Sequence, residues 1–323
     1  MRLRVLAAVA LMAVLFVGVV AYIYGGVAGA RRALVVATTT SLYDTGLLDE
    51  VADEYARRYG VRLYFISVGT GLALKHAERG DADAVLVHAP SEEARFLAGG
   101  YGGVRKIIAY NFFLIVGPPS DPAGIRGSTP TTALERIAEA GRAGNALWIS
   151  RGDKSGTHVK ERQLWEAAGF DPDELRGESW YVESGTGMGK TLMMASEMEA
   201  YTLADAGTYI RYLSGGLIRL DTLVRGGREL INVYSVMAVN PNVHPDVNFR
   251  EAVRFIEFLV SEDGQRLIAD FKVDGYTLFY PAVGVLREEP TSEVARWIMD
   301  YAFINGSECP PQYRMGVNEL YQG

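Results

Sequence analysis

The stretch Ser150-Arg151-Gly152-Asp153-Lys154-Ser155-Gly156-Thr157 decides the fold class, because it joins a predicted strand to a predicted helix through a hydroxyl-rich turn. An apolar run over residues 146–149 precedes it, and residues 159–168 carry apolar side chains at helical spacing. Strand, polar turn and helix in this order are typical of an α/β protein. Taken alone, the stretch also fits an ordinary capped helix with a surface arginine.

The residue types of this turn favour an anion. Ser155 or Thr157 can cap the first helical turn, and Gly156 lets the backbone come close to a ligand. A helix N-terminus favours negative charge, and Arg151 adds a planar fork of donors that matches an oxyanion. We therefore predict that Arg151, Ser155, Gly156 and Thr157 bind an oxyanion.

Two similar units lie nearer the N-terminus. The apolar runs over residues 33–37 and 61–66 predict buried strands, and each is followed by a hydroxyl-rich turn and a helical pattern. Alternating strands and helices predict a parallel sheet, in which all such turns meet at one edge, where ligands bind. The further residues that we expect to line the site are Thr39, Thr40, Ser41, Ser67, Gly69 and Thr70.

Two long apolar runs, over residues 107–116 and 230–239, predict strands that cross between two lobes. The expected fold is therefore α/β and two-lobed, and each lobe has a mixed, mostly parallel sheet flanked by helices. Residues 31–112 and 238–323 are expected to form lobe 1, and residues 113–237 lobe 2. A chain of 323 residues, 49% of them hydrophobic, is long enough for two such cores.

Composition narrows the function. A net charge of -7 disfavours a general nucleic-acid-binding protein, which needs a basic face. The single Cys309 excludes an intrachain disulfide and a multi-cysteine metal site, and the four histidines lack paired metal-ligand spacing. We expect no cofactor and no bound metal cation.

The first 30 residues predict export. Arg2 and Arg4 precede an apolar run over residues 5–24, which is about long enough to span a bilayer as a helix. Ala28-Gly29-Ala30 then fits a signal-peptide cleavage pattern. Residues 1–30 are thus a signal peptide or an N-terminal membrane anchor, and both place the rest of the chain outside the cytoplasm, at the outer face of the membrane or in the periplasm.

Several motifs together resemble those of a known family. They are Thr38-Thr39-Thr40-Ser41, Val68-Gly69-Thr70-Gly71, Asp83 with Val87-His88-Ala89-Pro90, Ser150-Arg151-Gly152-Asp153 with Ser155-Gly156-Thr157-His158, and Gly187-Met188-Gly189. With these motifs the sequence resembles the substrate-binding proteins of tungstate ABC uptake systems. The resemblance implies a periplasmic-binding-protein fold of the type II class, a dianion held between the lobes and delivery to an ABC permease in the membrane. It also implies a monomer without enzymatic activity.

The choice of oxyanion depends on Asp153. Tungstate and molybdate carry no proton near neutral pH and need donors only, whereas a phosphate with one proton also needs an acceptor. If Asp153 points at the ligand, phosphate is favoured; if it pairs with Arg151, tungstate or molybdate is favoured. We expect the pair with Arg151, and the choice between tungstate and molybdate stays open.

Two other functions compete with this interpretation. An exported hydrolase would use a serine with His88 or His158, but no recognisable spacing of nucleophile, base and orienting acid supports it. The stretch Ser184–Thr191 resembles a Walker A loop, yet Ser184 stands where the first glycine is required.

His88 follows a predicted strand. We expect its imidazole to bond backbone groups at the strand end, and the alternative is that it forms a polar wall of the pocket.

Overall fold

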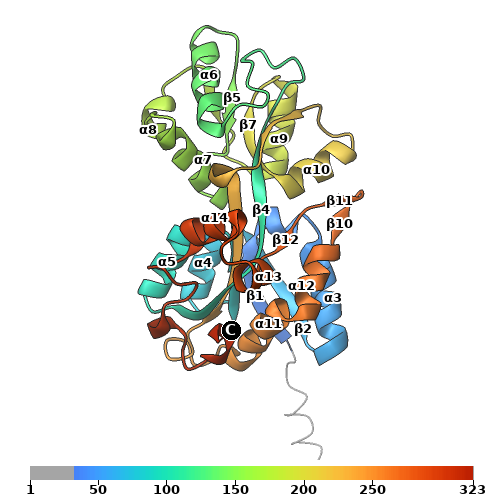
Figure 1. Ribbon diagram of the computed structural model, residues 1–323, viewed down its shortest axis with the longest axis vertical. Helices are drawn as coiled ribbons and strands as arrows, with labels where there is room; N and C mark the ends of the chain where they lie inside the picture. Colours follow the sequence, from blue (N-terminus) through green and yellow to red (C-terminus); the bar gives the residue numbers. More distant parts are fainter. Residues whose placement is uncertain (1–32, 323) are drawn as a thin grey trace, which may run out of the picture.

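The computed structural model describes residues 33–322. The predicted signal peptide or anchor, residues 1–30, lies outside the described residues. Within residues 33–322, no helix combines the length and the apolar character needed to cross a membrane. Figure 1 shows two bodies arranged along the long axis of the molecule, with a narrow waist between them.

The lower body in Figure 1, called lobe 1, is built on a six-stranded path of the main sheet. Its strands are β1 (Ala33–Thr39), β2 (Arg62–Val68), β3 (Ala84–Val87), β4 (Gly102–Gly117), β9 (Ile231–Val239) and β12 (Tyr280–Pro281). The spatial order is β12-β4-β9-β3-β1-β2, in which β1 pairs in parallel with β2 and β3, and the other neighbours are antiparallel. The ends of β1 and β2, which carry two of the three hydroxyl-rich turns, therefore share one edge, whereas β5 pairs with β6 in a separate sheet.

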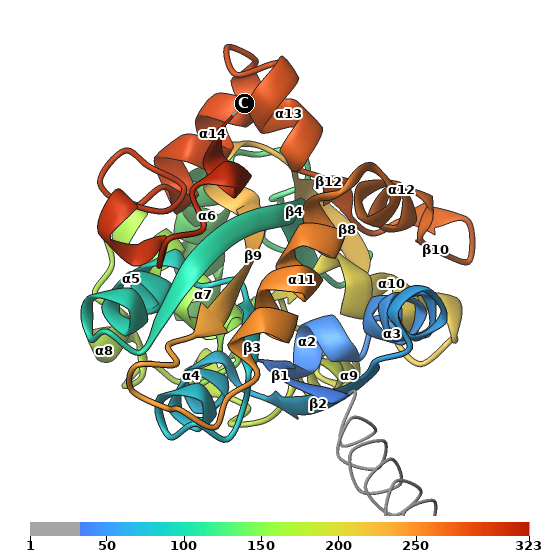
Figure 2. The same ribbon diagram turned by 90° about the horizontal axis from the view of Figure 1, so that it is seen from below.

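Helices cover both faces of this sheet, and Figure 2 shows α11 lying across β9 and β4. The helices of lobe 1 are α2 (Thr40–Tyr43), α3 (Leu47–Tyr59), α4 (Thr70–Glu78), α5 (Pro90–Ala98), α11 (Phe249–Val260) and α12 (Glu262–Asp270). α11 buries Phe255, Ile256 and Leu259 at helical spacing in the core of this lobe. This apolar stripe explains why the segment is helical and which face it turns inward.

The upper body in Figure 1, called lobe 2, surrounds the second half of β4. Its strands are β5 (Trp148–Ser150), β6 (Tyr181–Glu183), β7 (Thr202–Asp205) and β8 (Asp221–Arg225). Its helices are α6 (Pro130–Arg142), α7 (Gly156–Ala167), α8 (Pro172–Leu175), α9 (Met188–Glu197) and α10 (Ala206–Ser214). The pairing of β4 changes from β9 to β7 between Phe112 and Phe113, so one strand belongs to both lobes.

The core of lobe 2 is rich in tryptophan. Trp148, Trp165 and Trp180 are buried, and the ring centroids of Trp148 and Trp165 lie 5.2 Å apart at an interplanar angle of 83°. Such edge-to-face pairs add to the energy of burial. They join β5 to α7, the two elements on either side of the turn at residues 150–157.

The C-terminal segment packs against the waist. It consists of the β10–β11 hairpin (Lys272–Val273 and Tyr276–Thr277), β12, α13 (Val283–Glu288) and α14 (Glu293–Ala302). α14 touches lobe 2 through Tyr301, whose ring centroid lies 4.2 Å from Lys160 Nζ, and through an Asp300–Arg228 ion pair at 3.0 Å. The C-terminal segment thus braces the region where the chain passes between the lobes (Figure 1).

The predicted α/β, two-lobed class is confirmed. The prediction of mostly parallel sheets is wrong, because β3, β9, β4 and β12 pair with one another in antiparallel fashion in lobe 1, and β7 and β8 pair antiparallel with β4 in lobe 2. The predicted limits at residues 112/113 and 237/238 stay a prediction.

Candidate functional site

The first wall of the site is the turn after β1. Thr39 caps α2, and its hydroxyl accepts a hydrogen bond from Leu42 N at 3.3 Å. Thr39 Oγ1 also lies 3.3 Å from Ser41 Oγ, and both residues are buried. Thr40, the first residue of α2, is half-buried. This turn therefore brings two hydroxyls to the strand edge, as predicted.

His88 belongs to this wall. Its Nε2 lies 3.3 Å from Ser41 Oγ, and its Nδ1 lies 2.9 Å from Asn232 Oδ1. The expectation that His88 bonds backbone groups is wrong, because both contacts are with side chains. The imidazole ring is 1% exposed and stands as a polar wall at the end of β3, which was the alternative interpretation.

The turn after β2 gives the second contribution. Gly69 caps α4 with extended backbone, and Thr70 opens the helix with its side chain buried. Ser67 is half-buried near the end of β2, where it pairs with Thr38 of β1. Of these three predicted residues, Thr70 carries a buried hydroxyl at the strand edge.

The lobe 2 wall is the turn between β5 and α7. Arg151 is 1% exposed, and its Nε donates to Asp153 Oδ2 at 3.2 Å while its Nη2 forms an ion pair with the same oxygen. Asp153 Oδ1 accepts from Ser155 N at 3.1 Å, and Ser155 caps α7 by accepting from His158 N at 3.3 Å. Asp153 pairs with Arg151, as the sequence led us to expect.

A buried glutamate fixes this turn from behind. Glu161 Oε2 accepts from Arg151 N at 3.2 Å, and Oε1 accepts from Trp148 Nε1 at 2.9 Å and Tyr181 OH at 2.7 Å. These bonds tie α7 to β5 and β6. Burial raises the pKa of Glu161, although its hydrogen bonds act in the opposite direction.

The two walls meet at Gly156. A Cβ added to Gly156 would lie 3.0 Å from His88 Cε1 and 3.2 Å from Thr70 Oγ1. Since Gly156 begins α7 in lobe 2 and the other two residues belong to lobe 1, the lobes are closed on each other here. A glycine is needed at this point for the close approach.

Four donors on the turns of the two walls are left over. Thr70 Oγ1, Ser150 Oγ, Thr157 Oγ1 and Arg151 Nη1 are buried and make no hydrogen bond with the described residues 33–322. A buried donor without a partner costs roughly 1–3 kcal/mol, so such groups mark a place for an acceptor. A ligand whose surface consists of acceptor oxygens fits these donors.

The charge of Arg151 acts on the neighbouring titratable groups. Burial lowers the pKa of His88 to about 4, and the positive charge of Arg151 acts in the same direction, while the bond to Asn232 opposes it. Burial raises the pKa of Asp205, and the charge of Arg151 lowers it. At neutral pH the imidazole is therefore uncharged, and Arg151 is the cation of the site.

Sequence reasoning missed two residues behind His88. Asn111 and Asn232 pair in register on β4 and β9, and Asn232 Nδ2 donates to Asn111 Oδ1 at 2.9 Å. Both are buried polar residues inside the long apolar strands. An amide in the middle of an apolar strand was the signal that could have found them.

The polar groups of the remaining motifs bond within their own loops. In the stretch that resembles a Walker A loop, Thr191 Oγ1 bonds Ser184 Oγ at 2.8 Å and Gly187 O at 3.1 Å. His158 Nδ1 accepts from Lys154 N at 2.9 Å and so closes its own turn. Residues 33–322 contain no group of three His, Cys, Asp or Glu side chains that could hold a metal ion.

Residues 26–263 match the family model described as the PBP superfamily domain. Over 257 residues the chain is 40% identical to the tungstate-binding protein TupA of Peptoclostridium acidaminophilum, which covers 78% of this chain and 86% of that protein. The chain belongs to the PBP superfamily and is a homologue of TupA.

Other relatives agree with this family. A putative ABC transporter anion-binding protein of Haloferax volcanii is 42% identical over 266 residues, 81% of this chain and 75% of that protein. The solved structure of TupA from Desulfovibrio alaskensis G20 superposes with a TM-score of 0.68 at 43% identity, covering 77% of this chain and 98% of that one. These relatives are named for binding tungstate or, in the Haloferax protein, an anion.

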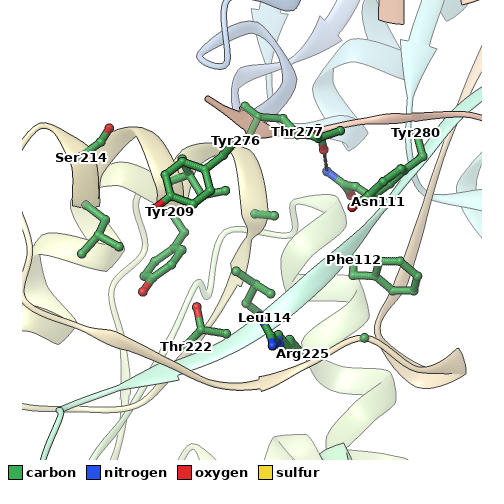
Figure 3. A pocket seen from close by; sticks show the side chains of 15 residues that line it. Asn111, Phe112, Leu114, Tyr209, Ser214, Thr222, Arg225, Tyr276, Thr277 and Tyr280 are labelled. Carbon is green, nitrogen blue, oxygen red and sulfur yellow. Dashed lines mark hydrogen bonds between the residues drawn. The ribbon is translucent and has the colours of Figure 1, made fainter. Parts of the chain in front are cut away.

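A separate cavity of about 680 Å³ lies on the flank of the waist (Figure 3). Its lining comes from β4, β8, α10 and the segment 276–280, and includes Asn111, Tyr209, Arg225, Tyr276 and Tyr280. We call it the hinge cavity. It contains none of the predicted site residues, and its exposed aromatic rings suit an oxyanion poorly.

Proposed function

We propose that this protein captures tungstate between its two lobes outside the cytoplasm and delivers it to an ABC permease. The observation that carries the proposal is the set of buried donors without partners on the turns at the closed contact between the lobes, namely Thr70 Oγ1, Ser150 Oγ, Thr157 Oγ1 and Arg151 Nη1. The names of the relatives support tungstate as the oxyanion.

The state of Asp153 supports an ion that needs donors only. Its carboxylate forms an ion pair with Arg151 and accepts a hydrogen bond from Ser155 N. It therefore orients the guanidinium and is not positioned to accept a hydrogen bond from a protonated ligand. Tungstate and molybdate both meet this requirement, and a phosphate with one proton meets it less well. Thr39, Thr40, Ser41, Ser67, Gly69, Ser155 and Gly156 complete the proposed site.

The protein works as a binding protein and not as an enzyme. Ser41, His88 and Asn232 stand in the order of nucleophile, base and orienting group found in hydrolases. However, an imidazole with a pKa of about 4 is a weak base at neutral pH, and Ser41 is 6% exposed. The proposed working form is a monomer held outside the cell membrane by residues 1–30, or released after their cleavage.

Isothermal titration tests the function. We expect the protein from residue 31 onward to bind tungstate tightly, molybdate comparably or less tightly, and sulfate and phosphate much more weakly. Tight binding of phosphate with weak binding of tungstate would assign the protein to phosphate transport. Turnover of p-nitrophenyl acetate that is lost in Ser41→Ala would favour the hydrolase.

A further inference from the structure

A chain of buried hydrogen bonds connects the hinge cavity with the oxyanion site. It begins at the main-chain carbonyl of Leu278, which accepts from Asn111 Nδ2 at 3.2 Å (Figure 3). Asn111 Oδ1 accepts from Asn232 Nδ2 at 2.9 Å. Asn232 Oδ1 then lies 2.9 Å from His88 Nδ1, and His88 Nε2 lies 3.3 Å from Ser41 Oγ.

The Leu278 carbonyl decides which group donates and which accepts in each hydrogen bond of this series. A carbonyl oxygen can only accept, so the Asn111 amide must turn its NH₂ group to Leu278 and its oxygen to Asn232. Asn232 must therefore donate to Asn111, and its own oxygen faces the imidazole. Because that oxygen can only accept, Nδ1 of His88 carries the hydrogen.

The other ring nitrogen is consequently an acceptor. Burial keeps the imidazole uncharged at neutral pH, since the pKa of His88 is lowered to about 4. Nε2 thus holds a lone pair, and the Ser41 hydroxyl is the donor in the bond between them. Stacking fixes the plane of the ring, because the centroid of Tyr234 lies 4.9 Å away at an interplanar angle of 30°.

A lone pair on this wall matters for the ligand. The Cε1–Nδ1 edge of the His88 ring borders Gly156, whereas Nε2 lies 3.3 Å from Oγ of Ser41, itself a residue of the proposed site. Removal of the Ser41 hydroxyl would therefore leave the Nε2 lone pair beside a bound anion. A lone pair repels an unprotonated oxyanion, whereas it accepts a hydrogen bond from a protonated one such as hydrogen phosphate. In this structure the Ser41 hydroxyl covers it.

We propose that His88 is a positioning and specificity-determining residue. The hydrogen bonds that begin at Leu278 hold it as the Nδ1–H tautomer, and the Ser41 hydroxyl donates to its Nε2, so that the nitrogen lone pair is not presented to a bound anion. The role of this cover rests on the oxyanion function proposed above. The tautomer itself does not, and it can be measured without ligand.

The tautomer is tested by ¹⁵N NMR of histidine-labelled protein, in which only four histidines give signals. At pH 7 without ligand, His88 is expected to show a protonated Nδ1 and an unprotonated Nε2. Asn232→Leu removes the acceptor at Nδ1 and should shift the ring toward the Nε2–H form. Asn232→Asp keeps an acceptor there and should retain the Nδ1–H form.

The matched control is Ser214→Ala. Ser214 lines the hinge cavity but takes no part in the hydrogen bonds between Leu278 and Ser41, so this substitution should leave the His88 signals unchanged. Circular dichroism and thermal melting confirm that each variant folds. An Nε2–H signal in the wild-type protein, or a wild-type spectrum in a folded Asn232→Leu variant, would overturn the assigned tautomer.

The cover is tested by titration with molybdate and phosphate. Ser41→Ala uncovers Nε2, so we expect molybdate affinity to fall at least fivefold and phosphate affinity to stay the same or rise. An equal loss for both anions would reduce Ser41 to a simple donor and overturn the specificity role of His88. If the wild-type protein binds none of the oxyanions, the proposed function fails, while the tautomer result still stands.

Discussion

The proposed oxyanion site and the hinge cavity both lie between elements of the two lobes, but they differ in how far their lining residues are exposed to solvent. At Gly156 the lobes touch, and every predicted donor there is buried or half-buried. In the hinge cavity, Tyr276 and Tyr280 remain 59% and 41% exposed. A small ion held by directed donors needs the first kind of space, where exclusion of water strengthens each contact. Volume alone therefore does not identify the site.

Arg151→Ala should give the largest effect on binding. Loss of a charge-assisted hydrogen bond costs about 1.5–3 kcal/mol, so oxyanion affinity should fall at least tenfold in a calorimetric titration. Arg225→Ala is the matched control, because Arg225 is an exposed cation of the hinge cavity. An equal loss of oxyanion affinity in both variants would contradict the assignment of the ligand to the proposed site and not to the hinge cavity.

Gly156→Ala should weaken binding by a smaller factor. The new methyl group would lie 3.0 Å from His88 Cε1, so the lobes must part by a few tenths of an ångström to admit it. We expect affinity to fall severalfold with little change in melting temperature. Gly187→Ala, at a helix start with nothing within 4 Å of the added carbon, should keep wild-type affinity.

Acid should destabilise the oxyanion site through His88. The pKa of His88 is about 4 in the folded protein and about 6.5 in an unfolded chain, so the unfolded state binds the proton first. The contribution to stability is full above pH 6.5 and declines as the pH falls toward 4, by about 3 kcal/mol. Urea unfolding at pH 7 and pH 4.5 should show a smaller loss for His88→Gln than for the wild type. Identical losses would contradict a buried, neutral His88.

Tyr276→Ala should have the smallest effect. Its ring lines the hinge cavity and is largely exposed, so its removal should leave oxyanion affinity unchanged within twofold. A large loss measured by the same titration would place the ligand, or a step of closure, in the hinge cavity.

Local sequence patterns were sufficient for the strand ends and the turns. Thr39 and Ser155 cap helices as their positions before apolar periodic segments predicted, and Asp153 pairs with Arg151 two residues away. These features depend on neighbours in the chain. Propensity and spacing describe such short-range geometry well.

Contacts between segments that lie far apart in the sequence could not be predicted from these local patterns. The bond between His88 and Asn232 joins residues 144 positions apart, and the contact of Gly156 with His88 depends on the angle between the lobes. The partner of His88 could not be predicted, because it is the pairing of β3 with β9 that brings Asn232 close to His88. The hinge cavity likewise combines four separate segments.

The most direct test is the position of the ion itself. Crystals grown with tungstate should show one strong anomalous peak from tungsten, within hydrogen-bonding reach of Arg151, Thr70 and Thr157. A peak there would confirm that the closed junction is the binding site. A peak in the hinge cavity, or none in a crystal of the closed form, would contradict the assignment.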